Sequence, residues 1–197
     1  MIHPDTELRF VNEEVGVGVF ATKFIPKGTI VWISDDLNII LDEDYVDSLD
    51  ELRREMLIKY TYQENNGDYI LNWDHSRYMN HSFQPTCIDT AYEFQLAARD
   101  INPGEQLTSD YGILGDDEDF EAVPEEGTSR TMVKVDDYLN YYQEWDEMAR
   151  EAFKYFSHVD QPLKYLIKKE FVDKVNAVTC GKEPLDSILT TFIDELD

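Results

Sequence analysis

The pattern of apolar and polar residues divides the chain into a strand-rich first part and a helical second part. Residues 15–33 are rich in Val, Ile, Phe and Thr, and glycine or proline interrupts them at turn-like positions. This composition predicts short strands joined by turns. Residues 69–111 return to short segments, with Tyr92, Phe94 and Leu96 alternating and a turn at residues 102–104. Strands are therefore expected on both sides of a central segment.

The central segment, residues 42–60, has a helical rather than a strand-like period. It opens with Asp42, Glu43 and Asp44, and acidic residues suit the positive end of a helix dipole. Apolar residues then recur at helical spacing: Tyr45, Val46, Leu49, Leu52 and Met56. We expect one amphipathic helix, inserted into the β-rich part.

The last third of the chain is predicted to be helical. One face of a long helix carries Tyr138, Tyr142, Trp145, Ala149, Ala152 and Phe156. Asp136 is placed to cap this helix. A second helix is expected near Asp160 and Pro162, and a third near Pro184. The third helix would carry Leu185, Ile188, Leu189, Phe192 and Leu196.

A dense run of acidic residues separates these two parts. It contains Asp116, Asp117, Glu118, Asp119, Glu121, Glu125 and Glu126. Like charges at this density disfavour compact structure, which predicts a flexible acidic linker. The expected organisation is a domain over residues 8–114 with a helical insert near 42–60, a linker over 115–130, and a helical segment over 131–197.

Composition and charge restrict the class of partner. A chain of 197 residues with 42% hydrophobic residues can bury one core, with a small appended subdomain. Its 17 Lys and Arg against 42 Asp and Glu give a formal net charge of −25, which argues against neutralising nucleic-acid phosphates. The charge favours a basic protein partner, while the alternative that it only maintains solubility stays open.

The two cysteines and the N-terminal residues indicate the cellular compartment of the protein. Cys87 and Cys180 lie far apart, with no Cys or His neighbour at metal-ligand spacing, so neither a disulfide framework nor a bound metal is expected. The N-terminal residues lack a signal peptide, and no apolar run is long enough to span a bilayer. We therefore expect an intracellular protein, cytoplasmic or nuclear, without membrane contact.

Three short segments are candidates for chemistry, and each alone has an ordinary structural alternative. The first, Gly16-Val17-Gly18, is either a plain turn between strands or a place where the backbone approaches a ligand. Asn80-His81-Ser82 is either a polar turn or a ligand contact. Asp110-Tyr111-Gly112 can simply end a strand with a packed aromatic ring.

The order and spacing of these segments resemble the SET-domain family. The resemblance extends from about Phe10 to Gly112 and includes Phe24-Ile25-Pro26-Lys27-Gly28. Its two longer motifs are Arg77-Tyr78-Met79-Asn80-His81-Ser82-Phe83-Gln84-Pro85 and Pro103-Gly104-Glu105-Gln106-Leu107-Thr108-Ser109-Asp110-Tyr111-Gly112. The C-terminal third matches only in being helical.

The resemblance implies a mostly β, α+β SET fold, a β-clip with a C-terminal pseudoknot, followed by the helical unit. It also implies methyl transfer from S-adenosylmethionine to a lysine of a basic protein, such as a histone-like tail or a ribosomal protein. Tyr111 would be the catalytic residue, without a metal. The implied cofactor-binding residues are Gly16, Val17, Gly18, Asn80, His81 and Tyr111. The alternative is a catalytically silent SET-fold protein that holds a basic partner through its acidic surface.

The reaction also makes a physical demand on the lysine channel. A lysine ammonium with a pKa near ~10.4 must lose a proton before it attacks, which costs roughly 4 to 5 kcal/mol at neutral pH. A dry aromatic channel and a nearby sulfonium both favour the neutral amine. Trp32, Tyr78 and Ser109 are the candidate channel residues, and the small Ser109 leaves room for products beyond monomethyl-lysine. Because a carboxylate would stabilise the ammonium, we expect Asp89 to point away, or to lie only at the channel mouth.

The chain departs from the family pattern at three places. Thr86 replaces an asparagine that is frequent in the family, which removes one hydrogen-bonding option near the knot. Val31-Trp32 replaces a Glu-Tyr pair, so Trp32 is either a channel wall or a core residue. The family's frequent zinc-binding cysteine cluster is absent after Gly112. The aromatics that could close the channel instead, or simply pack in the core, are Phe120, Tyr138, Tyr141 and Tyr142.

Overall fold

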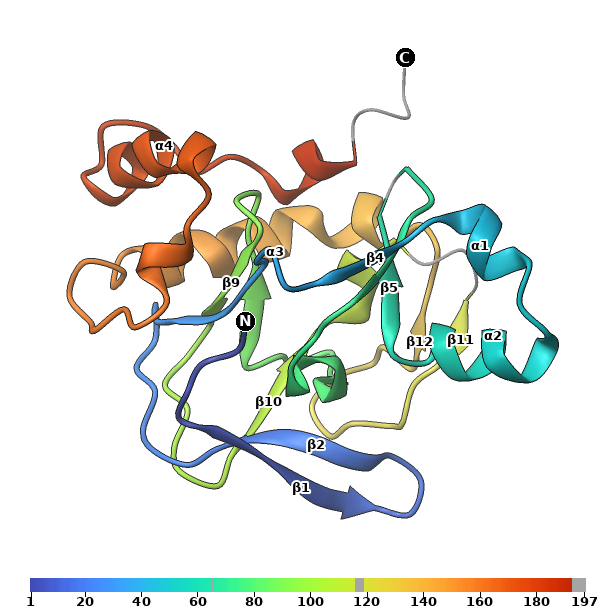
Figure 1. Ribbon diagram of the computed structural model, residues 1–197. Helices are drawn as coiled ribbons and strands as arrows, with labels where there is room; N and C mark the ends of the chain where they lie inside the picture. Colours follow the sequence, from blue (N-terminus) through green and yellow to red (C-terminus); the bar gives the residue numbers. More distant parts are fainter. Residues whose placement is uncertain (65, 116–118, 193–197) are drawn as a thin grey trace.

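A four-stranded sheet carries the glycine turn and both longer motifs. The computed structural model describes residues 1–64, 66–115 and 119–192. In the sheet order the strands are β1 (Thr6–Asn12), β2 (Gly16–Ala21), β10 (Gln106–Ser109) and β7 (Asn80–His81) (Figure 1). β2 pairs antiparallel with β1 and β10, and β10 pairs parallel with β7. β1 lies before the strands that the hydrophobic pattern predicts.

A second sheet separates two apolar clusters. Its strands, in order, are β3 (Ile30–Ile33), β9 (Phe94–Ala97) and β8 (Cys87–Asp89). All four residues of β9 are buried, because alternate side chains enter different clusters. Phe94 and Leu96 pack with the helical C-terminal part, whereas Ala97 packs with Val19 and Leu107 of the first sheet.

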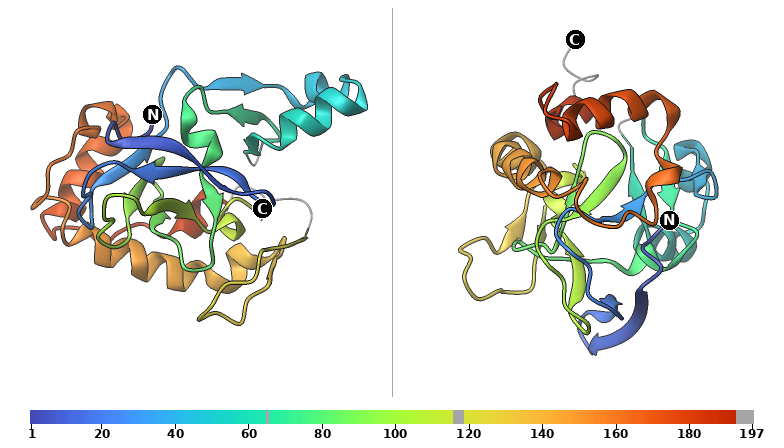
Figure 2. Two further views of the ribbon diagram at one scale, coloured as in Figure 1. Left: turned by 90° about the horizontal axis from the view of Figure 1, so that it is seen from below. Right: turned by 90° about the vertical axis from the view of Figure 1, so that its left-hand side faces the viewer.

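The insert differs from the single amphipathic helix that its pattern predicts. A three-stranded sheet, β4 (Ile39–Leu41), β6 (Tyr69–Leu71) and β5 (Thr61–Gln63), flanks two short helices, α1 (Glu43–Asp47) and α2 (Glu51–Ile58). The expectation of one helix is wrong, because Asp42 and Asp50 each cap a separate helix through a backbone N–H. Only Val46 is buried on the two helices. The insert extends away from the rest of the molecule (Figure 2, left).

The C-terminal part is helical, as expected, with different boundaries. It contains α3 (Asp137–Phe153), η3 (Lys164–Leu166), α4 (Lys169–Thr179) and η4 (Ile188–Thr191). Asp136 stands at the start of α3 but makes no capping bond; Asp137 instead accepts the Lys134 N–H at 3.1 Å. The third expected helix is a short 3-10 turn, and Leu196 lies outside the described residues. Thus the expected α+β class, with its helical C-terminal unit, is confirmed.

The acidic stretch forms a hairpin. β11 (Phe120–Glu121) pairs antiparallel with β12 (Met132–Val133), and residues 119–135 are called the β11–β12 hairpin below. The expectation of a flexible linker is wrong for residues 119–130, because specific side chains fix this segment to the knot; residues 116–118 lie outside the described residues. Within the described ranges, no helix is long and apolar enough to cross a membrane.

Candidate functional site

The sheet brings the two longer motifs into direct contact. Parallel pairing places Asn80 beside Thr108 and His81 beside Ser109. The 3-10 helix η2 (Tyr111–Ile113) follows β10 after Asp110, so Tyr111 lies close to His81. η1 (His75–Tyr78) leads into β7 from the other side. Residues that are far apart in the sequence therefore share one site, called the knot below.

Thr86 holds the knot together, so its departure from the family pattern does not leave a gap. Its hydroxyl accepts the Thr108 N–H at 2.9 Å, and its own N–H donates to the Thr108 hydroxyl at 3.1 Å. The Thr86 hydroxyl also donates to the Gln106 carbonyl at 3.2 Å. A threonine thus replaces the hydrogen bonds of an amide side chain with reciprocal bonds to β10.

The glycine turn meets the same knot. Gly16 has a φ of +84°, a conformation that glycine adopts without strain. A Cβ on Gly18 would lie 2.7 Å from Asn80 Nδ2, so a larger residue there would displace the Asn80 side chain. Asn80 Nδ2 donates to the Val17 carbonyl at 3.1 Å. All three sequence segments therefore converge, and the glycine at position 18 leaves room for the Asn80 side chain.

A hydrogen bond joins Tyr111 to His81, and the second ring nitrogen of His81 is a buried donor without a partner among the described residues. The Tyr111 N–H donates to His81 Nδ1 at 3.1 Å, and the Tyr111 hydroxyl donates to the Met79 carbonyl at 2.5 Å. Burial lowers the pKa of His81 below its ordinary value, against the raising effect of Asp110 and Glu125. A neutral His81 with Nδ1 as acceptor carries its proton on Nε2. That Nε2 is buried and has no hydrogen-bond partner within the described part of the chain.

Of the four aromatic residues expected to close the site, Phe120 is the one in ring contact with it. Its ring lies 6.0 Å from His81 and 6.2 Å from Tyr111. Tyr138 instead stacks on Phe192 at 4.7 Å, and both α3 residues Tyr141 and Tyr142 pack against the core. The core alternative therefore describes the three tyrosines, whereas the β11–β12 hairpin reaches the knot through Phe120.

Two charged residues that the sequence pattern did not single out fix the hairpin. One Glu125 oxygen accepts from the Ser82 hydroxyl and from the Phe83 N–H, both at 3.1 Å. Arg130 lies 4.3 Å from the Phe83 ring and 4.1 Å from the Tyr141 ring.

Arg130 also joins the hairpin to both flanking elements. It pairs with Asp110, next to the candidate catalytic tyrosine, and with Asp137 of α3 at 2.6 Å. These carboxylate side chains are only 2% and 4% exposed, so Arg130 compensates two buried charges at once.

Two of the candidate channel residues, Trp32 and Ser109, are linked through Gln95 and Asp89 of the second sheet. Trp32 pairs with Gln95 across β3 and β9, and Gln95 pairs with Asp89 across β9 and β8. Gln95 Nε2 donates to both Asp89 oxygens, at 3.0 and 3.1 Å, and the Ser109 hydroxyl donates to Asp89 Oδ2 at 3.2 Å. Gln95 and Ser109 thus hold the Asp89 carboxylate beside a channel candidate, and whether it points away from the channel or lies at its mouth stays a prediction.

The remaining channel candidate, Tyr78, lies on the insert side. Its ring packs edge-on against Tyr60 at 5.4 Å, and Trp32 packs edge-on against Tyr62 at 6.4 Å. Tyr62 and Tyr78 are both partly buried against the cluster that contains Trp32. Trp32 is thus a core residue by packing, although its indole nitrogen is buried without a hydrogen-bond partner among the described residues.

A hollow adjoins the glycine turn. It has a volume of about 350 Å³ and lies between Glu14 and the β11–β12 hairpin. Its other lining residues are Glu121, Ala122, Val123, Pro124 and Thr131. A larger hollow, of about 520 Å³, lies between Lys27 and α3, and the glycine turn, Asn80, His81 and Tyr111 do not line it. Across the described ranges, no group of three His, Cys, Asp or Glu side chains could hold a metal ion.

Comparison with known families agrees with this geometry. The SET domain model matches residues 16–112, which include the glycine turn, the knot and Tyr111. Residues 16–112 belong to the SET-domain family, whose members are commonly lysine methyltransferases and generally bind S-adenosylmethionine. No curated protein matches the sequence closely enough to serve as a named relative.

Proposed function

We propose that this protein transfers a methyl group from S-adenosylmethionine to the side chain of a lysine in a basic protein. The observation that carries the proposal is the convergence of Gly16-Val17-Gly18, Asn80-His81 and Tyr111 at one knot. A turn, a polar loop and a strand end would each have a plain structural use alone. Their direct contact, together with family membership, supports a shared chemical role.

The residues at the glycine turn fit the cofactor. A Cβ on Gly16 would meet nothing within 4 Å, so the backbone there is open to a ligand. His81 Nε2 is a buried donor that lacks an acceptor, and such a donor is costly unless a bound molecule supplies one. Gly16, Val17, Gly18, Asn80 and His81 would hold S-adenosylmethionine, which supplies an electrophilic methyl group when bound.

Tyr111 is suited to orienting the substrate amine. Its hydroxyl hydrogen goes to the Met79 carbonyl, so the hydroxyl oxygen serves as an acceptor. An accepting oxygen can align an amine N–H and thereby direct the nitrogen lone pair, and alignment of this kind supplies much of an enzyme's rate. Phe120 and Phe83 surround the His81–Tyr111 pair with apolar rings and limit the access of water.

The net charge of −25 supports a basic substrate protein. An excess of acidic side chains attracts Lys-rich segments and raises their encounter rate, while it repels nucleic acid. A histone-like tail and a lysine-rich ribosomal protein have the required charge. The substrate is therefore best sought among the basic proteins of a cell extract.

The test measures cofactor binding and methyl transfer separately. We expect the wild-type protein to bind S-adenosylmethionine in calorimetry and to label proteins in a mixture of core histones and ribosomal proteins with a radioactive methyl group. Tyr111→Phe should reduce labelling roughly 100-fold or more, with cofactor affinity within a few-fold, because one orienting hydroxyl is lost. Asn80→Ala should weaken cofactor binding by about 1–3 kcal/mol.

Two results would contradict the proposal. Absence of cofactor binding by the wild-type protein would remove its basis. Binding of basic proteins without any methyl transfer would instead favour the non-catalytic SET-fold binding protein. Near-normal labelling by Tyr111→Phe would show that the tyrosine has a different role.

A further inference from the structure

A row of polar side chains crosses one face of the second sheet, the face that packs against Val19 and Leu107. Trp32, Gln95 and Asp89 are successive cross-strand partners on β3, β9 and β8, and this set is called the Trp32–Gln95–Asp89 row. Trp32 is 9% exposed and Gln95 8% exposed. Asp89 as a whole residue is partly exposed, whereas its carboxylate is surrounded by protein atoms. Apolar side chains would pack here more simply, so the polar row needs an explanation.

Two atoms of the row have no partner within the described residues. They are the Trp32 indole nitrogen, a donor, and Gln95 Oε1, an acceptor. Buried polar groups are nearly always paired, and leaving one unpaired destabilises the folded state. The free amide oxygen lies on the side chain that also bonds the Asp89 carboxylate, so two kinds of oxygen acceptor are neighbours. Such a pair of acceptors suits a cationic nitrogen.

The row is also connected to the candidate catalytic residue. Ser109 donates to Asp89, and Ser109 lies two residues before Tyr111 on the same strand and turn. At the Trp32 end of the row, the Trp32 ring packs edge-on against the Tyr62 ring. Aromatic rings favour a cation beside them and exclude water from it. An amine that is held near Tyr111 would therefore be within the surroundings of Asp89.

We propose that Asp89 accepts the proton that the substrate lysine must lose before methyl transfer. This inference rests on the proposed function. In the step, one N–H bond of the lysine ammonium breaks and its electron pair stays on nitrogen, while an O–H bond forms on the Asp89 carboxylate. A charged pair becomes a neutral amine and a neutral carboxylic acid, so no other reactant is needed. Asp89 later releases the proton to water.

The surroundings of Asp89 favour this transfer. Burial raises the pKa of Asp89 to about 6, against the lowering effect of hydrogen bonds from Gln95 and Ser109. An ordinary aspartic acid has a pKa near ~3.9 and an ordinary lysine near ~10.4, and burial moves the two values toward each other. A dry pocket therefore reduces the penalty of the neutral pair.

A neighbouring charge acts on the pKa of Asp89 in the same direction as burial. Asp110, on the segment after β10, raises the pKa of Asp89. Burial raises the pKa of Tyr62 of β5, and the charges of Glu64, Asp89 and Glu93 raise it further. The Tyr62 phenol therefore stays protonated. The Arg130 guanidinium of the β11–β12 hairpin pairs with Asp110 and Asp137, and not with Asp89.

The first test does not depend on turnover. Aspartate labelled with carbon-13 at its carboxyl group would be followed by NMR while n-butylammonium chloride is added, with sodium chloride at equal ionic strength and n-butanol as controls. We expect the Asp89 resonance to move with the ammonium and to titrate at a lower pH in its presence. An Asp89 titration unaffected by n-butylammonium would overturn the proposal.

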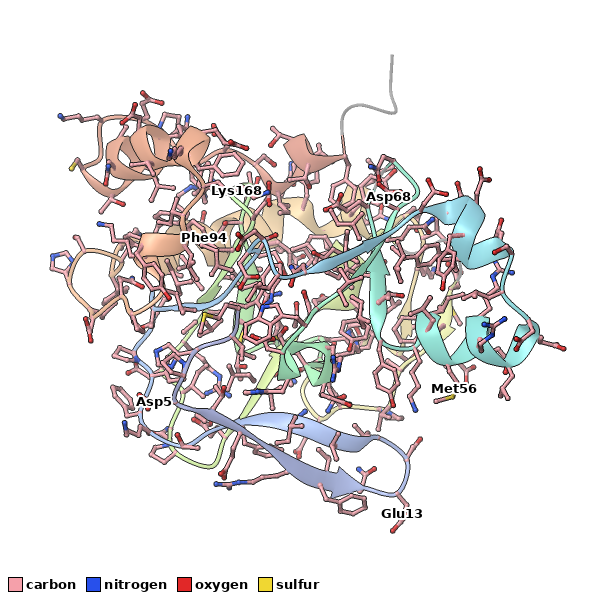
Figure 3. All side chains as sticks on the ribbon, viewed as in Figure 1. Asp5, Glu13, Met56, Asp68, Phe94 and Lys168 are labelled. Carbon is pink, nitrogen blue, oxygen red and sulfur yellow. The ribbon has the colours of Figure 1, made fainter. Side chains whose placement is uncertain are left out.

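The second test compares Asp89→Asn with Glu13→Gln. Both changes remove one carboxylate, and Glu13 lies at the exposed tip of the β1–β2 turn (Figure 3). The wild-type rate of methyl transfer should rise as the pH passes about 6, where Asp89 ionises, and Glu13→Gln should behave alike. Asp89→Asn should lose at least tenfold in kcat near neutral pH and regain rate steadily toward alkaline pH, where solvent deprotonates the amine.

A stability measurement shows whether Asp89→Asn is correctly folded. The folded protein holds the Asp89 proton more tightly than the unfolded chain does, so wild-type stability should fall as the pH rises from about 4 to about 6. Asp89→Asn should fold and should lack this decrease. An unchanged pH–rate profile in the folded variant would assign Asp89 a merely structural role. Absence of cofactor binding by the wild type would instead contradict the proposed function, and the NMR test would still decide on Asp89.

Discussion

The β11–β12 hairpin and the insert with α1 and α2 show opposite relations between composition and packing. The hairpin begins in the acidic run, yet Phe120, Glu125 and Arg130 attach it to the knot. The insert helices carry apolar residues at helical spacing, yet Leu52 is 69% exposed and Met56 is 54% exposed. Met56 can be seen at the outer side of α2 in Figure 3. A few well-paired polar groups thus fix the hairpin, whereas the apolar side chains of the insert helices are largely unpacked.

The difference shows where the stability of the site comes from. Arg130 connects the hairpin, the Asp110–Tyr111 segment and α3 through two ion pairs and two ring contacts. These contacts, with the Glu125 hydrogen bonds, hold the hairpin against the knot. In contrast, the insert is stabilised mainly by its own small sheet, β4-β6-β5. Substitutions in the two segments should therefore have very different effects.

The largest effect is expected from Arg130→Met. This change keeps much of the side-chain volume but leaves the Asp110 and Asp137 carboxylates buried without their cation, which should cost about 3–5 kcal/mol of unfolding free energy. Urea denaturation measures the loss. Arg9→Met is the control, because Arg9 pairs with Glu7 on the surface, where an ion pair contributes less than about 1 kcal/mol. Equal losses in the two variants would show that the Arg130 cluster does not anchor the hairpin.

An intermediate effect is expected from Glu125→Gln. The amide keeps one oxygen acceptor but loses the charge that strengthens the bonds from the Ser82 hydroxyl and the Phe83 N–H, so we expect a loss of about 1 kcal/mol. Hydrogen exchange of the Phe83 amide should become faster. Glu126→Gln is the matched control, since Glu126 is exposed and its backbone carbonyl makes the bond to Gln84. Faster exchange in the control as well would point to the overall charge of the hairpin as the cause.

The meeting of the three segments at the knot was expected from their order and spacing, through the resemblance to the SET-domain family. Glycine at residues 16 and 18 and the Asn80-His81 pair belong to motifs of fixed spacing, and strand pairing brings them together. Partners chosen by tertiary packing were not predictable. Nothing in the acidic run distinguishes Glu125 from its neighbours, and only the folded chain shows that Arg130 meets Asp110 and Asp137.

Asp89 illustrates the same limit on the other side of the knot. From charge alone we expected Asp89 to point away from the channel or to lie only at its mouth, because an isolated carboxylate would stabilise the substrate ammonium. The structure adds Gln95 and Ser109, which hold the carboxylate inside. Whether a charge is tolerated in the interior depends on partners from other strands, and a single sequence does not specify those partners.

The smallest effect is expected from the insert, with Leu52→Gln and Met56→Gln. Glutamine has nearly the same helix propensity as leucine and methionine, and both side chains are mostly exposed on α2. The unfolding free energy should therefore change by less than about 0.5 kcal/mol for each variant. Val46→Ala is the control, because Val46 is fully buried on α1 and its truncation should cost about 2 kcal/mol. A loss from Leu52→Gln as large as that from Val46→Ala would mean that the apolar face of α2 is packed in solution, and the contrast between insert and hairpin would then disappear.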